Sequence, residues 1–158
     1  MYNDYIARIV RAYNAAGVLP AGSYQGECDE SGRPHGTGTM LYVDGSIYRG
    51  EWNQGTRQGL GTIHYETGGC YHGQFHANLL EGDGTFWHAD QRVYRGGFRA
   101  DHRHGVATLW DSGEVAVSRF QAGIAVGAGA LWSADGEAFA LHNGRPVEVP
   151  DGAHGRLL

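Results

Sequence analysis

A short phrase recurs in this chain about every 23 residues, and this repeat limits the possible folds more than any other feature. The copies are YQGEC, YRGEW, YHGQF and YRGGF, which begin at Tyr24, Tyr48, Tyr71 and Tyr94, and the eroded AVSRF and FALHN, which begin at Ala116 and Phe139. Repeats of this length build arrays in which each unit packs only against its neighbours. The sequence therefore predicts a stack of similar units.

A second phrase lies between the copies of the first. Its copies are GTGTM, GLGTI, GDGTF, GVATL and GAGAL, which begin at Gly36, Gly59, Gly82, Gly105 and Gly127. Each unit then consists of two short segments with period-two alternation, joined by a glycine-bearing turn, which is the pattern of a β-hairpin. We therefore expect an all-β repeat protein, an elongated single-layer antiparallel sheet of about five consecutive β-hairpins.

Pairing the two phrases explains the alternation of rings and glycines. In the unit that begins at Tyr48, the pairing sets Gly50 opposite Gly61 and Trp52 opposite Gly59, so rings can lie over bare glycine backbone. The expected row residues are Tyr24, Tyr48, Gly50, Trp52, Gly59, Gly61, Tyr71, Gly73, Phe75, Gly82, Gly84, Tyr94, Gly96 and Phe98. One face of the sheet would thus build its own core.

These phrases resemble the MORN (membrane occupation and recognition nexus) repeat, whose pattern is Tyr-x-Gly-x-Phe/Trp followed by Gly-x-Gly. The likeness covers residues 24 to about 144, and four units match closely. The unit from Ala116 has lost its tyrosine and glycine, as a terminal cap can. The resemblance implies a non-catalytic scaffold that binds other proteins in cytoskeletal, ciliary or membrane-junction assemblies, and MORN arrays sometimes dimerise through their end repeats.

The same pairing predicts an apolar row on the opposite face. This outer row consists of Leu41, Ile47, His64, Cys70, Trp87, Val93, Trp110, Val115, Trp132 and Ala138. Its tryptophans occupy equivalent places in successive units, about 10 Å apart. A large apolar row usually has a partner, and tryptophan is enriched at binding hot spots. The predicted protein-binding residues are Trp87, Trp110, Trp132, Val93, Val115 and Arg95.

Two other interpretations of the outer row stay open: the indoles pack on one another and on the neighbouring valines, or another part of the chain covers them. Residues 2–16 predict a short amphipathic helix, ended by Gly17 and Pro20. Its apolar stripe would dock through Tyr5, Ile6, Ile9, Val10 and Tyr13, beside Tyr2. At about 20 Å it is too short to cover ten strands. It could cap the first unit, cross the outer row or enter a partner's groove.

The chain divides into three expected parts. These are a helix and linker over residues 1–22, the hairpin array over 23–144 and a tail over 145–158. The free sheet edge near Phe139 to Val149 is either blunted by Pro146 and Pro150 or used to form a homodimer. The amino terminus lacks the pattern of a signal peptide, so the cytoplasm is the default location.

Composition and charge argue against several other functions. The net charge is −5, which gives no general attraction to nucleic acid or anionic lipid. A local excess of arginine in the fourth unit (Arg92, Arg95, Arg99 and Arg103, with His102) keeps a peripheral membrane module that binds anionic phospholipid headgroups as the alternative function.

Residues with potential for chemistry do not form a site. His35 and His104 occupy equivalent turn positions but lie three units apart, so we expect no metal and no cofactor. Cys28 and Cys70 fit no metal spacing and are expected to be thiols rather than a disulfide. No nucleophile has an identifiable base and orienting group, so we do not expect an enzyme.

Overall fold

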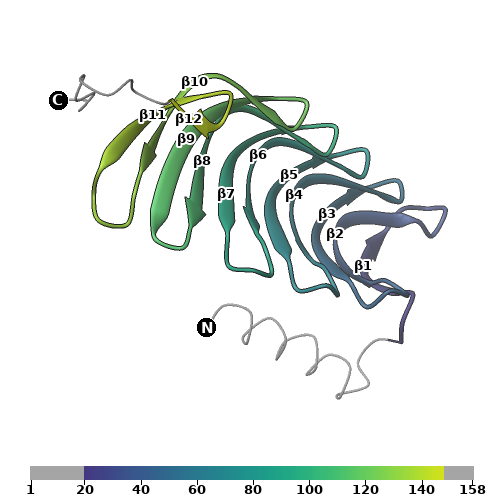
Figure 1. The fold of residues 1–158 in the computed structure, drawn as a ribbon. Coiled ribbons are helices and arrows are strands. Elements are labelled where there is room, and N and C mark those ends of the chain that lie inside the picture. The colour runs from purple at the N-terminus through teal and green to yellow at the C-terminus, as the bar shows by residue number, and fades with distance from the viewer. Residues whose placement is uncertain (1–19, 148–158) are drawn as a thin grey trace, which may run out of the picture.

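The computed structural model describes residues 20–147, which form one antiparallel sheet (Figure 1). Each strand pairs with its neighbours in the sequence, so the sheet order is the chain order. The strands are β1 (Ser23–Cys28), β2 (Pro34–Leu41), β3 (Ile47–Asn53), β4 (Thr56–His64), β5 (Cys70–His76), β6 (Leu79–Trp87), β7 (Val93–Arg99), β8 (His102–Asp111), β9 (Glu114–Gln121), β10 (Ile124–Trp132), β11 (Ala138–His142) and β12 (Arg145–Pro146). The strands bow strongly, so the layer is curved along its whole length.

The prediction of an all-β sheet of consecutive hairpins is confirmed. The described residues contain a sixth, short hairpin, in which two residues of β12 pair with the end of β11. The FALHN copy therefore forms a strand even though it lacks a second phrase. The predicted amino-terminal helix, with Tyr5, Ile6, Ile9, Val10 and Tyr13, lies outside the described residues.

The face that carries the tyrosines, here the inner face, holds the core. Its register agrees with the sequence pairing, because Tyr48 faces Ile63 within a hairpin and Ile63 faces Tyr71 between hairpins. The small row is equally regular, with Gly50 opposite Gly61. The buried core cluster comprises Tyr48, Trp52, Ile63, Tyr71, Phe75, Leu80, Tyr94, Phe98, Ala107 and Phe120.

Each repeat tyrosine lies flat across the row of small residues. The Tyr48 hydroxyl donates to the carbonyl of Glu51 at 2.9 Å, and the ring is fully buried. A Cβ atom at Gly61 would stand 2.5 Å from the Cε2 atom of Tyr48. Burial raises the pKa of the Tyr48 hydroxyl, which keeps the group protonated as a donor. The glycines are therefore the floor on which the tyrosine rings rest.

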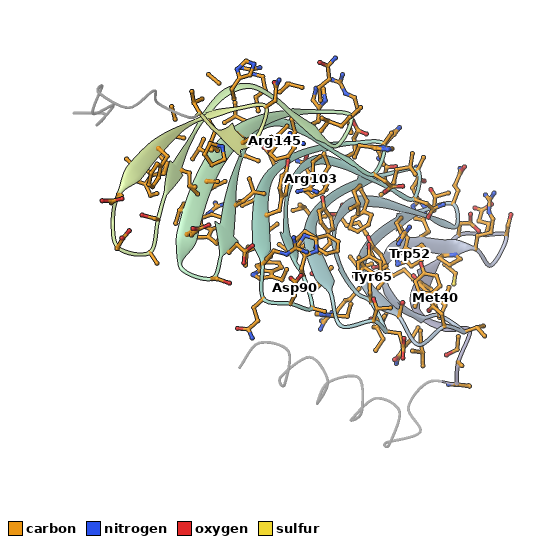
Figure 2. All side chains as sticks on the ribbon, viewed as in Figure 1. Met40, Trp52, Tyr65, Asp90, Arg103 and Arg145 are labelled. Carbon is orange, nitrogen blue, oxygen red and sulfur yellow. The ribbon has the colours of Figure 1, made fainter. Side chains whose placement is uncertain are left out.

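The rings form a continuous zigzag of edge-to-face contacts. Tyr48 meets Trp52 of its own strand at 5.0 Å between centroids and Phe75 of the next hairpin at 5.1 Å. Tyr71 makes the same two contacts with Phe75 and Phe98. Such pairs are worth about 0.5–1.5 kcal/mol each beyond the area they bury. Figure 2 shows labelled inner-face side chains, including Trp52, within the hollow of the curved sheet.

One predicted pairing is wrong. Trp52 faces Arg57 rather than Gly59, because residues 58–60 of β4 bulge opposite the single residue Glu51. Gly59 has φ +69°, which favours glycine, and the N–H of Leu60 donates to Glu51 Oε1 at 2.8 Å. Gly59 therefore makes the bulge and does not pair with Trp52 within the hairpin. Its predicted pairing with Phe75 of the next hairpin is confirmed.

The same correction applies to the next two units. Bulges at the equivalent places of β6 and β8 set Phe75 opposite Leu80 and Phe98 opposite Arg103 within their hairpins, in place of Gly82 and Gly105. The arginines cover the rings: the Arg103 guanidinium lies 5.2 Å from the Phe120 centroid.

The two-residue turns that join the two strands of each hairpin also link that hairpin to the one before. Ala77 and Asn78 both have positive φ, so this turn is tight although it contains no glycine. The Asn78 N–H donates to the carbonyl of Arg57, while the Arg57 N–H donates to Asn78 Oδ1 at 2.8 Å. Asp101 and Leu80 repeat this exchange one unit later. These reciprocal bonds fix the spacing between units.

Candidate interaction surface

The outer row exists in the register that the sequence predicts. Backbone pairing joins Trp87 to Val93, Val93 to Trp110, and Trp110 to Val115. Val115 then pairs with Trp132. Because side chains alternate along a strand, and each of these residues adjoins an inner-face residue, the row lies on the outer face.

Burial changes steeply along this row. Leu41, Ile47 and Cys70 are only 3%, 4% and 2% exposed. Trp87, Val93 and Val115 are half-buried. Trp110 and Trp132 are 37% and 42% exposed. The row is therefore covered over the first hairpins and open over β8 and β10.

Trp110 stands where two hollows of the outer face meet. One is a shallow groove of about 650 Å³ across β4–β8, with Arg95 and Val106 among its lining residues. The other, of about 400 Å³, lies beside the turn between β8 and β9 and includes Asp90, Glu114 and Val115. The predicted binding residues Trp110, Arg95 and Val115 thus lie close together around one indole.

The groove contains apolar residues that the sequence interpretation missed. Leu60 and Val106 are 54% and 58% exposed. They occupy the same position, between Gly59 and Gly61 and between Gly105 and Ala107, in units that lie two repeats apart. The corresponding residues elsewhere are Thr37, Asp83 and Ala128. An apolar side chain between two small residues on a solvent-facing strand is the signal that would have found them. They widen the apolar surface away from the tryptophans.

The arginines of the fourth unit do not form one basic patch. Arg92 makes an ion pair with Asp90 at 2.7 Å, and this hydrogen-bonded guanidinium holds the pKa of that carboxyl below its usual range. Arg103 lies over inner-face rings. Arg95 and Arg99 are exposed on strand β7. The local charge available to an anionic surface is correspondingly smaller than the sequence suggests.

Within residues 20–147, no group of three His, Cys, Asp or Glu side chains could hold a metal ion. The Gly-x-Gly phrases lie in strands, away from any helix start within the described range, so they do not have the setting of a phosphate loop. Across the same stretch no helix is long and apolar enough to cross a membrane. Cys28 is exposed and Cys70 is buried.

Comparison with known families agrees with the repeat geometry. The MORN repeat family model matches residues 30–47, 48–70, 71–91 and 94–115, which together make up more than half of the chain. The four matches cover the strands from β2 to β8. No curated protein matches the sequence significantly. MORN repeats are non-enzymatic modules that generally take part in protein or membrane interactions.

Proposed function

Because this chain belongs to the MORN repeat family, we propose that it is a non-catalytic scaffold that binds another protein through its outer face around Trp110 and Trp132. The observation that carries the proposal is the exposure of these two indoles, 37% and 42%, on an otherwise regular sheet. The inner-face rings are buried in the core, so they are not available to a partner.

The chemistry of the surface favours a protein segment as the ligand. Two indoles about 10 Å apart, two strand spacings, can bracket apolar side chains of one extended or helical segment. Val115 between them, with Val106 and Leu60 along the groove, continues the apolar surface. Arg95 offers a planar donor to a carboxylate at the rim. Tryptophan and arginine are the types most often found at hot spots.

We further propose a cytoplasmic protein that belongs to a larger cytoskeletal or ciliary assembly. Its support is the resemblance of the repeats to MORN arrays that act as scaffolds there. An elongated open sheet suits this role, because its outer face can hold partners at fixed spacing without enclosing them. A homodimer through the carboxyl-terminal edge is a further proposal, for which the two residues of β12 offer only a short pairing edge.

The alternative function is a peripheral membrane module that binds anionic phospholipid headgroups. The exposed Arg95 and Arg99 support it, together with indoles that can sit at a membrane interface. The net charge of −5 and the pairing of Arg92 with Asp90 oppose it. We therefore rank protein binding first.

The test compares protein capture by wild-type chain, Trp110→Ala, Trp132→Ala and Ile124→Ala. Ile124 is the matched control, since it is a large apolar residue, 68% exposed, at the turn at the far end of the β9–β10 hairpin. Loss of one hot-spot tryptophan costs at least about 2 kcal/mol, or about 30-fold in affinity. We expect both tryptophan variants to lose the same partner and Ile124→Ala to keep it. Retention of every partner by both variants would contradict the proposal.

Flotation with vesicles of phosphatidylserine and phosphatidylcholine separates the two functions. The scaffold proposal predicts no flotation at 50 or 200 mM salt. Flotation that weakens as salt rises, and that Arg95→Ala reduces, would favour the membrane module instead.

A further inference from the structure

In each of the first three units, a side chain closes the bulge of the Gly-x-Gly phrase. The acceptors are the side-chain oxygens of Glu27, Glu51 and Gln74, and the donors are the N–H groups of Thr37, Leu60 and Asp83. A Cβ atom at the bulge glycine of any of these units would collide with the same acceptor side chain. Each bulge therefore forms a small site for one oxygen acceptor, and these units fill that site themselves.

The fourth unit keeps the bulge but lacks this acceptor. Gly105 has φ +73°, close to the +69° of Gly59, and Val106 follows it as the donor residue. Gly97 of β7 takes the place of Glu51, so this position has no side chain to reach the Val106 N–H. A Cβ atom at Gly105 would meet nothing within 4 Å, so no side chain of residues 20–147 occupies the acceptor site. We call this site the open bulge.

Arginines surround the open bulge on the outer face. Arg119 takes the acceptor's position in the fifth unit, and it pairs with Val106 across β8 and β9. Arg95 and Arg99 lie on β7, two residues to either side of Gly97, and side chains two residues apart share a face of the sheet. All three arginines are exposed. The chain thus presents cations where its earlier units present acceptors.

Two carboxylates offset part of this charge. Asp83 lies opposite Gly97 on β6, and Glu81 of the same strand accepts the N–H of Ala100 at 3.0 Å. Three guanidinium groups against two carboxylates leave one positive charge in excess. His104, which pairs with Gly97 in the hairpin, adds to this excess only when it is protonated. An N–H donor in such surroundings favours an anionic oxygen acceptor.

We propose that the open bulge binds a carboxylate side chain of the partner protein, which takes the place that Glu51 fills in the second unit. The proposal rests on the function proposed above, because Val106 and Arg95 line the groove beside Trp110. A carboxylate fits better than a phosphate, since both units that hold an anion at this site hold a carboxylate. The bulge also offers one N–H donor rather than the cluster of donors that phosphate sites use.

The position of the open bulge defines a pattern in the partner. Val106 lies four residues from Trp110 on β8, a distance of about 13 Å along a strand, and both side chains lie on the outer face. The partner segment therefore carries an acidic side chain about 13 Å from the apolar side chain that contacts Trp110. In an extended segment these two residues are four positions apart.

Amide signals in two-dimensional NMR spectra of the full chain test the site. The probe is the peptide acetyl-Glu-Ser-Gly-Ser-Leu-amide, and its matched control has Gln in place of Glu. We expect the Val106 amide proton to move downfield with the Glu peptide, with an affinity about fivefold or more above that of the Gln peptide. The Leu60 amide, which Glu51 already holds, should stay in place. An unmoved Val106 amide, or equal affinities for the two peptides, would overturn the proposal.

The variant Gly97→Glu supplies the missing carboxylate from the chain itself. Its Val106 amide should lie downfield before any peptide is added and should not respond to the Glu peptide. A full response in the folded variant would overturn the proposal. A Cβ atom at Gly97 would stand 2.5 Å from the carbonyl oxygen of His104, so the hairpin must widen to accept it.

A second pair of variants covers the case in which Gly97→Glu does not fold. Arg119→Gln should weaken binding of the Glu peptide by about twofold or more. Arg49→Gln is the matched control, because Arg49 is an exposed outer-face arginine beside a bulge that has its own acceptor. It should leave the affinity unchanged. Equal effects of the two substitutions would overturn the proposal.

The same spectra separate this site from the binding surface at the tryptophans. Movement of the Trp110 indole N–H signal without the Val106 amide would overturn the carboxylate site and leave the protein-binding surface standing. Movement of the Val106 amide alone would support the carboxylate site and count against the tryptophan surface. Inorganic phosphate is a further probe. If it moves the Val106 amide at lower concentration than the Glu peptide does, the site is one for phosphate, such as a lipid headgroup, and the proposal is overturned.

Discussion

The substitution Gly61→Ala tests the packing of tyrosine on glycine at one atom. A Cβ atom there would stand 2.4 Å from the hydroxyl oxygen, 2.5 Å from Cε2 and 2.6 Å from Cζ of Tyr48. Carbon contacts are optimal at about 3.5–4.0 Å, so the ring must withdraw by about 1 Å. It has no free space in which to do so, because it is fully buried against Trp52 and Phe75.

The expected cost follows from three contributions. Overpacking of a tight core costs about 1–3 kcal/mol. Loss of the bond from the Tyr48 hydroxyl to the Glu51 carbonyl adds about 0.5–1.5 kcal/mol. Alanine recovers about 0.5–1 kcal/mol of the chain entropy that glycine loses on folding. The net expectation is a loss of about 2–3 kcal/mol in the free energy of unfolding.

Urea unfolding followed by tryptophan fluorescence measures this loss, provided that the m-value is unchanged. A melting temperature lower by about 4–10 °C is the thermal equivalent for a chain of this size. Gly69→Ala is the matched control, because Gly69 also lacks a positive φ and its nearest new contact would be 3.3 Å, to Phe86. We expect that variant to change stability by less than about 0.5 kcal/mol.

The Tyr48→Leu background locates the effect. There Gly61→Ala should cost almost nothing, which gives a coupling of about 2 kcal/mol between the two positions. An equal cost in both backgrounds, or a Gly61→Ala protein as stable as wild type, would refute the packing of the ring on the glycine floor.

Two further predictions concern the turns and the outer row. Asn78→Ala should lower the free energy of unfolding by about 1–2 kcal/mol, because the Arg57 N–H loses its acceptor. Asn78→Asp keeps an acceptor and should lose less than half as much. Equal losses for the two variants in urea unfolding would contradict the role of Asn78 Oδ1 as that acceptor. Burial lowers the pKa of His64 below 6.5, and its Nδ1 has no hydrogen-bond partner among the described residues. As the pH falls, the unfolded chain takes up the proton first, so the free energy of unfolding should keep its full value above pH 6.5 and fall below it. His64→Leu should remove this part of the pH dependence of the melting temperature, and an unchanged pH profile in that variant would count against the prediction.

The strand register could be predicted from the sequence because it depends on local repetition. Aligning Tyr48 with Tyr71 fixes which residues face each other, and a slip by one residue would turn every ring to the wrong side. The outer row followed from the same alignment, including the equivalence of Trp110 and Trp132. The family resemblance rested on the same residues.

The bulge could not be read from spacing alone. A glycine at Gly59 fits both a pairing with Trp52 within the hairpin and a bulge with positive φ, and the sequence interpretation chose the first, although its pairing of Gly59 with Phe75 of the next hairpin is confirmed. The residue that decides between them is Glu51, whose carboxylate accepts the N–H of Leu60 and occupies the place a Cβ at Gly59 would need. Gln74 fills the corresponding place one unit later.

The burial of the outer-row side chains could not be predicted from the sequence, for a different reason. Leu41 and Trp110 occupy equivalent positions in their hairpins, yet one is buried and the other exposed. Identical local pattern gives identical register but not identical surroundings, since the cover depends on contacts distant in the sequence. The exposed part of the outer row is accordingly smaller than the sequence predicts, and Trp87 is half-buried.

The most direct test of a protein-binding surface at the open indoles is photo-cross-linking with benzoylphenylalanine placed in turn at positions 110, 132 and 124 of the full chain in cells. We predict that positions 110 and 132 capture one and the same protein, and that position 124 does not. Capture of that protein equally well from position 124, or of lipid alone from 110 and 132, would contradict the assignment.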